Sequence, residues 1–87
     1  MEEDLIEVIS IVQSSENIEK ILNYLEDRIK TPTKIAKALT LSQANVSRTL
    51  KKLMEHGLVK CLNPEKKIGR LYMITDLGKQ ALEYAKK

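Results

Sequence analysis

Residues 31–57 read TPTKIAKALTLSQANVSRTLKKLMEHG, and this stretch holds the two helix starts that decide the fold of the 87-residue chain. The first start is Thr31, a cap residue followed by a proline at the first helical position, where a missing N–H costs nothing. The second start is Ser42, which precedes an apolar stripe at helical spacing. The second helix is expected to span 43–56 and to end before Gly57, a residue suited to a left-handed C-cap.

Two helices joined by a turn of roughly three to four residues form a helix-turn-helix, which the pattern predicts over 31–56. In such a unit the second helix enters the major groove of DNA, and its N-terminal residues reach the base edges. The inward face of this helix is expected to hold Val46, Leu50, Leu53 and Met54. The side chains expected to face the bases are Gln43, Ala44, Asn45, Ser47 and Arg48.

These residue types suit base recognition. Arginine pairs bidentately with guanine, asparagine and glutamine pair with adenine, and an alanine methyl group can touch thymine. Lys51 and Lys52 lie further along the helix and are expected to meet phosphates, which position a protein without reading sequence. Each polar residue taken alone is also compatible with an ordinary solvated surface, so the set as a whole carries the prediction.

A hairpin and a last helix are expected downstream. Residues 58–62 and 70–74 have the composition of two short strands. Between them the run NPEKKIG supplies turn formers and two lysines, so 63–70 is predicted to be an exposed hairpin tip. Thr75 is expected to cap a C-terminal helix within 75–87.

Two helices are expected upstream. Residues 1–14 favour a helix over a strand, and its apolar arc covers more than half of the circumference. A helix that apolar needs partners on two sides, which predicts a homodimer contact through Leu5, Ile6, Val8, Ile9 and Val12, with the last helix as a second candidate. The next helix starts after Ser14 or Ser15 and carries the amphipathic stripe Ile18, Ile21, Leu22, Leu25 and Ile29.

Length and composition predict one small domain over 1–87, because 87 residues with 43% hydrophobic and 31% charged content suit a single thin core. The sequence has no internal repeat and no apolar run of membrane-spanning length, and it begins with the acidic MEED. A cytoplasmic protein with no membrane partner is therefore expected.

Charge is distributed unevenly along the chain. Residues 1–27 hold eight acids and one base, whereas residues 28–70 hold eleven bases and two acids. The basic stretch is a candidate footprint for a polyanion, although a solvated basic face would give the same count.

The residues needed for catalysis or metal binding are scarce. Cys61 and His56 are the single cysteine and the single histidine, so no metal site is expected, and Cys61 is interpreted as a small hydrophobic residue. The sequence also lacks a phosphate-cradling glycine loop and a nucleophile–base pair. We expect a protein that is not an enzyme and that has no cofactor.

The run 34–53 resembles the winged helix-turn-helix of small transcriptional regulators of the MarR and ArsR types, a build frequent among small archaeal DNA-binding proteins. The resemblance continues through EHGLV at 55–59 and GRLYMITDLG at 69–78, which are similar to the wing strands and the capped final helix. It implies a mainly α fold with a small β-hairpin wing over 58–74, in the order helix, helix, helix, turn, helix, strand, strand, helix.

The resemblance also implies contacts outside the second helix of the motif. Lys66, Lys67 and Arg70 match the wing, which lies along the DNA backbone or enters the minor groove. Thr31, Thr33 and Lys34 match the start of the preceding helix, which crosses the backbone. The chain departs from ArsR-type metal sensors in lacking ligand clusters, and from MarR-type proteins in its short flanking helices, so a small-molecule effector pocket is not expected.

The leading functional prediction is a homodimeric transcriptional regulator that binds double-stranded DNA sequence-specifically, with the recognition helix at 43–56 and the wing at 63–70. Two alternatives stay open at this point. One is a winged-helix protein-interaction module in a transcription or scaffold complex, since fold does not fix function. The other is an architectural DNA-binding protein without sequence preference, which would bind with a steep salt dependence.

Overall fold

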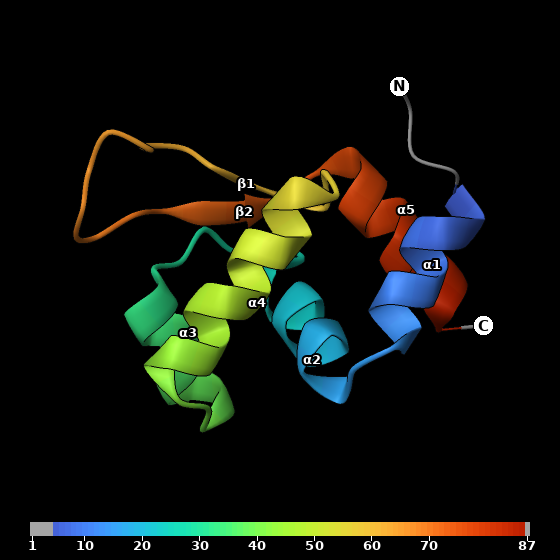
Figure 1. Ribbon diagram of the computed structural model, residues 1–87, viewed down its shortest axis with the longest axis horizontal. Helices are drawn as coiled ribbons and strands as arrows, with labels where there is room; N and C mark the ends of the chain where they lie inside the picture. The colour runs from blue at the N-terminus through green and yellow to red at the C-terminus, as the bar shows by residue number, and fades with distance from the viewer. Residues whose placement is uncertain (1–4, 87) are drawn as a thin grey trace.

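The chain folds into five helices and a two-stranded hairpin, as the computed structural model shows for residues 5–86 (Figure 1). In chain order the elements are α1 (Leu5–Gln13), α2 (Glu16–Leu25), α3 (Pro32–Leu39), α4 (Gln43–Glu55), β1 (Val59–Cys61), β2 (Tyr72–Ile74) and α5 (Asp76–Ala85). This order confirms the predicted fold class, a mainly α protein with a β-hairpin wing. Residues 1–4, which belong to the predicted first helix and to its acidic start, lie outside the described residues, as does Lys87.

Local sequence signals set the helix boundaries. Thr31 Oγ1 accepts a hydrogen bond from the backbone N–H of Lys34 at 3.3 Å, and Ser42 Oγ accepts one from Asn45 at 3.1 Å. Both caps were expected from the sequence, as was Gly57 in the left-handed region, with φ +74° at the exit of α4. At the start of α2, Ser15 occupies the cap position, but its side chain makes no capping bond.

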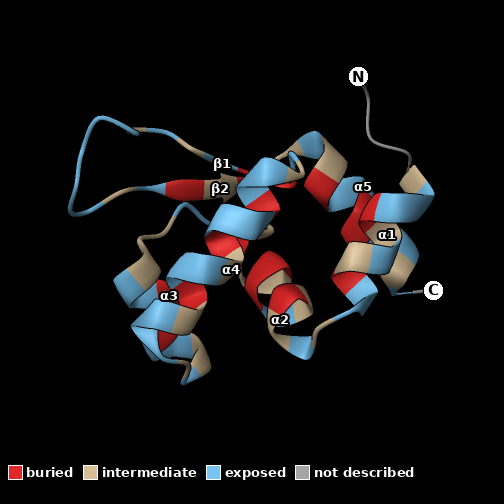
Figure 2. Cartoon of the chain, in the orientation of Figure 1, coloured by how far each residue is buried: buried red, intermediate tan, exposed pale blue. Residues whose placement is uncertain are grey.

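The core is built around α2, which packs against the other four helices and against β2. Its residues Ile21, Leu22 and Leu25 are fully buried. Figure 2 shows the buried face of every helix turned towards this centre and the exposed faces turned outwards. Helix α4 contributes Val46, Leu50 and Leu53 to the core, as the apolar stripe predicted.

Two apolar residues are more exposed than the sequence pattern predicted. Met54 was expected inside, yet 38% of it is exposed, because it lies at the edge of the α4 stripe and faces the hairpin instead of α2. Ile29 was expected to extend the α2 stripe, but α2 ends at Leu25, and Ile29 is 49% exposed in the connection to α3.

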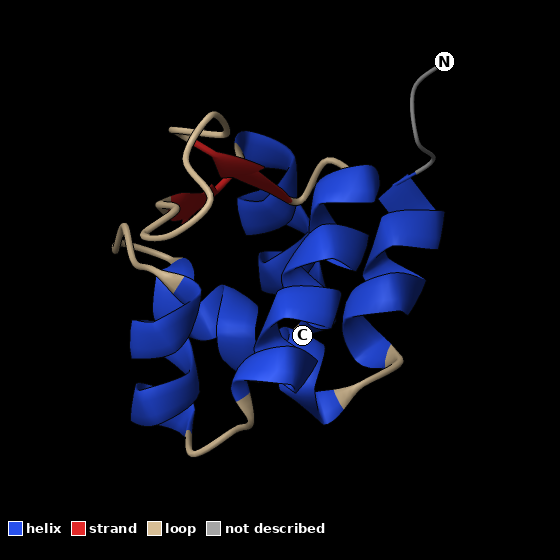
Figure 3. Cartoon of the chain, turned by 60° about the vertical axis from the view of Figure 1, so that its left-hand side comes forward, coloured by secondary structure: helices blue, strands red, loops and turns tan. Residues whose placement is uncertain are grey.

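The hairpin strands are antiparallel and pair Val59 with Ile74, Lys60 with Met73 and Cys61 with Tyr72 (Figure 3). Both strands are shorter than the predicted 58–62 and 70–74. At one end the N–H of Leu58 donates to the carbonyl of Leu53, so Leu58 belongs to the exit of α4. At the other end the N–H of Leu62 still donates to the carbonyl of Leu71 at 2.8 Å, but the N–H of Leu71 donates to the Asn63 side chain, so the regular ladder stops there.

The base of the hairpin is also joined to the segment before α3, which the sequence did not reveal. Lys30 and Tyr72 exchange two backbone hydrogen bonds, of 3.2 and 2.9 Å, in an isolated antiparallel bridge. The start of the helix-turn-helix and the root of the hairpin are therefore held side by side by the backbone itself.

Helix α1 packs against α5 and α2 of the same chain. Val8 and Val12, which were predicted to contact a second copy, are fully buried in this core, so that part of the dimer prediction is wrong. The apolar arc of α1 is wide enough to pack against two other elements. The sequence of α1 alone could not show that one of them is α5. Of the predicted dimer contacts, Ile6 stays 73% exposed and Leu5 and Ile9 are half-buried. Within residues 5–86, every helix is too short or too polar to cross a bilayer.

Candidate nucleic-acid interface

Helices α3 and α4 pack together across a tight turn and form the predicted helix-turn-helix. Thr40 adopts a left-handed conformation with φ 56°, and the N–H of Leu41 donates to the carbonyl of Ala36 at 2.9 Å. This turn reverses the chain in few residues and leaves one face of α4 clear of the rest of the protein (Figure 1).

The face of α4 opposite its buried stripe is exposed and basic. Ala44 and Arg48 lie exposed in the first half of the helix, and Lys51 and Lys52 lie exposed in the second half. Glu55, the single acid on this face, is the last residue of the helix. The face therefore offers positive charge over the middle of the helix, from Arg48 to Lys52, to an approaching polyanion.

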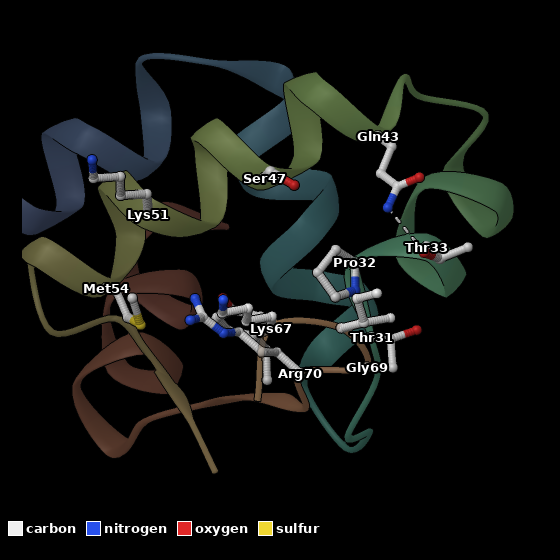
Figure 4. Close-up of a pocket in the computed structure, with 12 residues that line it drawn as sticks. Thr31, Pro32, Thr33, Gln43, Ser47, Lys51, Met54, Lys67, Gly69 and Arg70 are labelled. Carbon is white, nitrogen blue, oxygen red and sulfur yellow. Dashed lines mark hydrogen bonds between the residues drawn. The ribbon is translucent and has the colours of Figure 1, made fainter. Parts of the chain in front are cut away.

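A groove runs beside this face, between α4, the start of α3 and the hairpin loop (Figure 4). Its volume is about 490 Å³. Hydroxyl groups of Thr31, Thr33 and Ser47 line it, together with the cationic side chains of Lys51, Lys67 and Arg70. The fold thus brings together three parts of the molecule that the sequence analysis had assigned separately to DNA contact.

Gln43 and Thr33 are joined across this groove. The Nε2 amide group of Gln43 donates a hydrogen bond to Thr33 Oγ1 at 3.1 Å, which links the first turn of α4 to the first turn of α3 (Figure 4). Gln43 was predicted to contact bases and Thr33 to contact the DNA backbone, and the two side chains are in direct contact.

Asn45 is placed differently from the other residues expected to face bases. It is half-buried, on the flank of α4 away from the groove. The hydroxyl group of Thr49 donates to the backbone carbonyl of Asn45 at 2.8 Å and lies 3.2 Å from its Oδ1. The predicted set therefore divides into three positions on the helix: Gln43 and Ser47 in the groove, Ala44 and Arg48 on the open face, and Asn45 on the far flank.

The hairpin loop, residues 63–70, is organised by side-chain bonds to the backbone. Asn63 donates to the carbonyl of Gly69 at 3.2 Å and accepts from the N–H of Leu71 at 2.7 Å. Arg70 Nε donates to the carbonyl of Lys66. Arg70 is consequently half-buried and fixed to its own loop, whereas Lys66 and Lys67 are exposed at the tip.

The cations of the candidate interface lie away from α1 and α5. These two helices, which carry the acids Glu7, Asp76 and Glu83 and the base Lys79, lie at the end of the molecule opposite α3 and the loop tip (Figure 1). Within residues 5–86 the cations Arg48, Lys51 and Lys67 form no ion pair. They are therefore available to an external anion.

Sequence reasoning missed Met54 and Tyr72 as groove residues. Met54 could have been found, because it lies seven residues after Ser47 and eleven after Gln43, on the same side of an α-helix. Tyr72 enters the groove through its pairing with Lys30, for which the sequence carries no signal.

No cluster of three metal-ligating side chains occurs between residues 5 and 86. Cys61 is half-buried in β1, and its thiol lies 3.6 Å from Asn63 Oδ1, in the bonding network of the loop. In this position Cys61 contacts Asn63, the residue that organises the hairpin loop.

The helix-turn-helix of this chain is also found by comparison with known proteins. Residues 19–60 match the sequence pattern of the family described as bacterial regulatory protein, arsR family. The matched range runs from α2 through the helix-turn-helix into β1. None of the curated proteins matches the chain.

Solved structures with the same fold include DNA complexes. A mutant of ZitR from Lactococcus lactis is 31% identical, with a TM-score of 0.70, over 80% of this chain and 49% of that one. The transcriptional repressor CouR, bound to a 23-mer DNA duplex, is 26% identical, with a TM-score of 0.75, over 95% and 60% of the two chains. A mutant of MarR from E. coli in complex with operator DNA is 28% identical, with a TM-score of 0.74, over 93% and 59%.

These matches confirm the predicted resemblance to winged helix-turn-helix regulators of the MarR and ArsR types. The chain spans about half to three fifths of the length of these relatives.

Proposed function

We propose that this chain, a winged helix-turn-helix domain similar to ArsR-type and MarR-type regulators, binds double-stranded DNA sequence-specifically and regulates transcription. The observation that carries the proposal is the groove between α4, the start of α3 and the hairpin loop, with the cationic face of α4 beside it. Among its relatives, CouR and MarR are each described with bound DNA.

In this proposal α4 lies in the major groove. Arg48 is central on the open face and long enough to pair with guanine, while Ala44 offers a methyl group to thymine. Gln43 and Ser47 read bases from the groove side of the helix. Asn45 takes part if its bond to Thr49 is exchanged for a base contact.

The phosphate backbone is held on both sides of α4. The groove has the chemistry of a phosphate site, because Thr31 and Thr33 line it from the start of α3, and Lys51, Lys67 and Arg70 line it from α4 and the hairpin loop. Thr31, Thr33 and Lys34 contact the backbone from α3, and Lys66, Lys67 and Arg70 contact it from the wing. Lys51 and Lys52 provide further positive charge on α4.

We further propose that two copies bind together. The surface left for the contact combines Ile6, Leu5 and Ile9 of α1 with Tyr84 of α5, which is half exposed beside Leu5. Two recognition helices about 34–36 Å apart would then read successive major grooves of a palindromic site. This contact lies at the end of the molecule away from the wing (Figure 1).

The test is a selection of bound duplexes from a random DNA pool, followed by titration of the best sequence and of a scrambled duplex at two salt concentrations. We expect a palindromic consensus with at least ~10³-fold discrimination over scrambled DNA. Weak binding that depends steeply on salt and enriches no sequence would indicate an architectural protein instead. No binding to any duplex would indicate that the basic surface serves an acidic protein partner.

A further inference from the structure

We propose that Thr33 is a positioning residue that fixes the amide of Gln43 for reading adenine and couples this base contact to a phosphate contact. The inference rests on the proposed DNA-binding function and deepens it. It starts from the 3.1 Å hydrogen bond in which Gln43 Nε2 donates to Thr33 Oγ1, between two exposed side chains on different helices.

The bond decides which groups Gln43 presents. A glutamine amide has two N–H donors and one oxygen acceptor, and Thr33 takes one donor. In the proposed arrangement Thr33 accepts the N–H trans to the amide oxygen, so that the N–H cis to this oxygen and the oxygen itself stay available, a pair complementary to N7 and the N6 amino group of adenine in the major groove. A glutamine without this bond could turn its amide by half a rotation and donate to guanine or thymine instead.

The hydroxyl group of Thr33 can also donate a hydrogen bond to DNA. Within residues 5–86 its own proton has no acceptor in the protein, and the group lines the proposed phosphate groove (Figure 4). Donation of that proton to a phosphate oxygen polarises the hydroxyl group and strengthens its acceptor side, which is the side bonded to Gln43. The phosphate contact of Thr33 and the orientation of the Gln43 amide are then linked through one continuous series of hydrogen bonds.

The test uses the highest-affinity duplex recovered from a random pool and a panel in which each base pair is changed in turn. Binding is measured for the wild-type chain, Gln43→Ala, Thr33→Val and Thr33→Ser, with folding of each variant checked by circular dichroism. Gln43→Ala identifies the position that Gln43 reads. Thr33→Val removes the hydroxyl group with little change of shape, and Thr33→Ser is the matched control that keeps it.

We expect the wild-type chain to prefer adenine at one position by about 5- to 150-fold, which corresponds to one bidentate pair. Gln43→Ala should abolish that preference. Thr33→Val should reduce it about 2- to 12-fold, the range of one neutral hydrogen bond, and Thr33→Ser should restore it. Adding Thr33→Val to Gln43→Ala should change no base preference further.

Other results overturn the inference in separable ways. If Thr33→Val lowers affinity equally for all four base pairs, Thr33 is a phosphate contact alone, and the proposed function stands. If Gln43→Ala alters no base preference, the adenine contact is wrong. If the wild-type chain discriminates among no sequences, the proposed function fails and this inference fails with it.

Discussion

Replacing Gly78, in the first turn of α5, by alanine should destabilise the protein. Replacing a helical glycine by alanine ordinarily stabilises a helix by about 0.8–1 kcal/mol. Gly78, however, is buried, and a Cβ at this position would overlap the carbonyl oxygen of Leu58 and come within 2.7 Å of Cγ1 of Ile74. The principal obstacle is backbone, which cannot turn aside as a flexible side chain can.

The free-energy cost of Gly78→Ala can be worked out from the hydrogen bonds that a shift of α5 would strain. The Leu58 carbonyl accepts the N–H of Thr75 at 3.0 Å, and Thr75 Oγ1 accepts the N–H of Gly78 at 3.0 Å, so both bonds are strained when α5 shifts. Overpacking of this kind costs about 3 kcal/mol at the upper end of its usual range. The loss of one hydrogen bond adds about 1 kcal/mol. After subtracting the gain in helix propensity, we expect Gly78→Ala to lower the free energy of unfolding by about 3 kcal/mol.

The assay is urea unfolding followed by circular dichroism at a fixed protein concentration, so that dimerisation does not shift the result. Gln80→Ala, at an exposed position of the same helix, is the matched control and should change stability by less than about 0.5 kcal/mol. A Gly78→Ala variant as stable as the wild-type chain, or more stable, would refute the close packing of α5 against the exit of α4.

Three further predictions concern the proposed interface and dimer. Arg48→Ala should lower affinity for the selected duplex by about 1–3 kcal/mol and relax preference at one base position; an equal loss on every duplex in the panel would make Arg48 a phosphate contact. Replacing Lys66 and Lys67 together by alanine should weaken binding uniformly and reduce the salt slope by about one unit for each phosphate that the loop no longer neutralises, and an unchanged slope would remove the wing tip from the interface. Ile6→Asp should convert a dimer to a monomer in analytical ultracentrifugation, because it places a charge on a 73% exposed apolar side chain of the proposed contact; a variant that stays dimeric would move the interface elsewhere.

Features set by neighbouring residues were predictable from the sequence. The caps at Thr31, Ser42 and Thr75 and the left-handed Gly57 each depend on a few adjacent positions, and each was found where it was expected. The buried stripe of α4 follows from helical spacing, so the direction of its exposed face could be deduced as well. That is why the parts of the candidate interface could be named before their arrangement was known.

Features that depend on contacts distant in sequence could not be deduced. The apolar arc of α1 indicated two partners, but not that Val8 and Val12 would be buried within the same chain, where α1 packs against α5 and α2. Nothing in the pattern around Gln43 indicates that its amide meets Thr33. Met54 is an intermediate case, because a residue at the edge of a stripe is buried or exposed according to the neighbour that covers it.

The backbone bridge between Lys30 and Tyr72 has a consequence for the entropy of binding. Because it ties the segment before α3 to the root of the hairpin, one side of the groove keeps its width before any ligand arrives. The conformational freedom that binding removes then belongs mainly to the tip of the loop, where Lys66 and Lys67 extend into solvent. Rigid spacing at the root would discriminate between nucleic-acid shapes, while the tip would adapt to local variation in groove width.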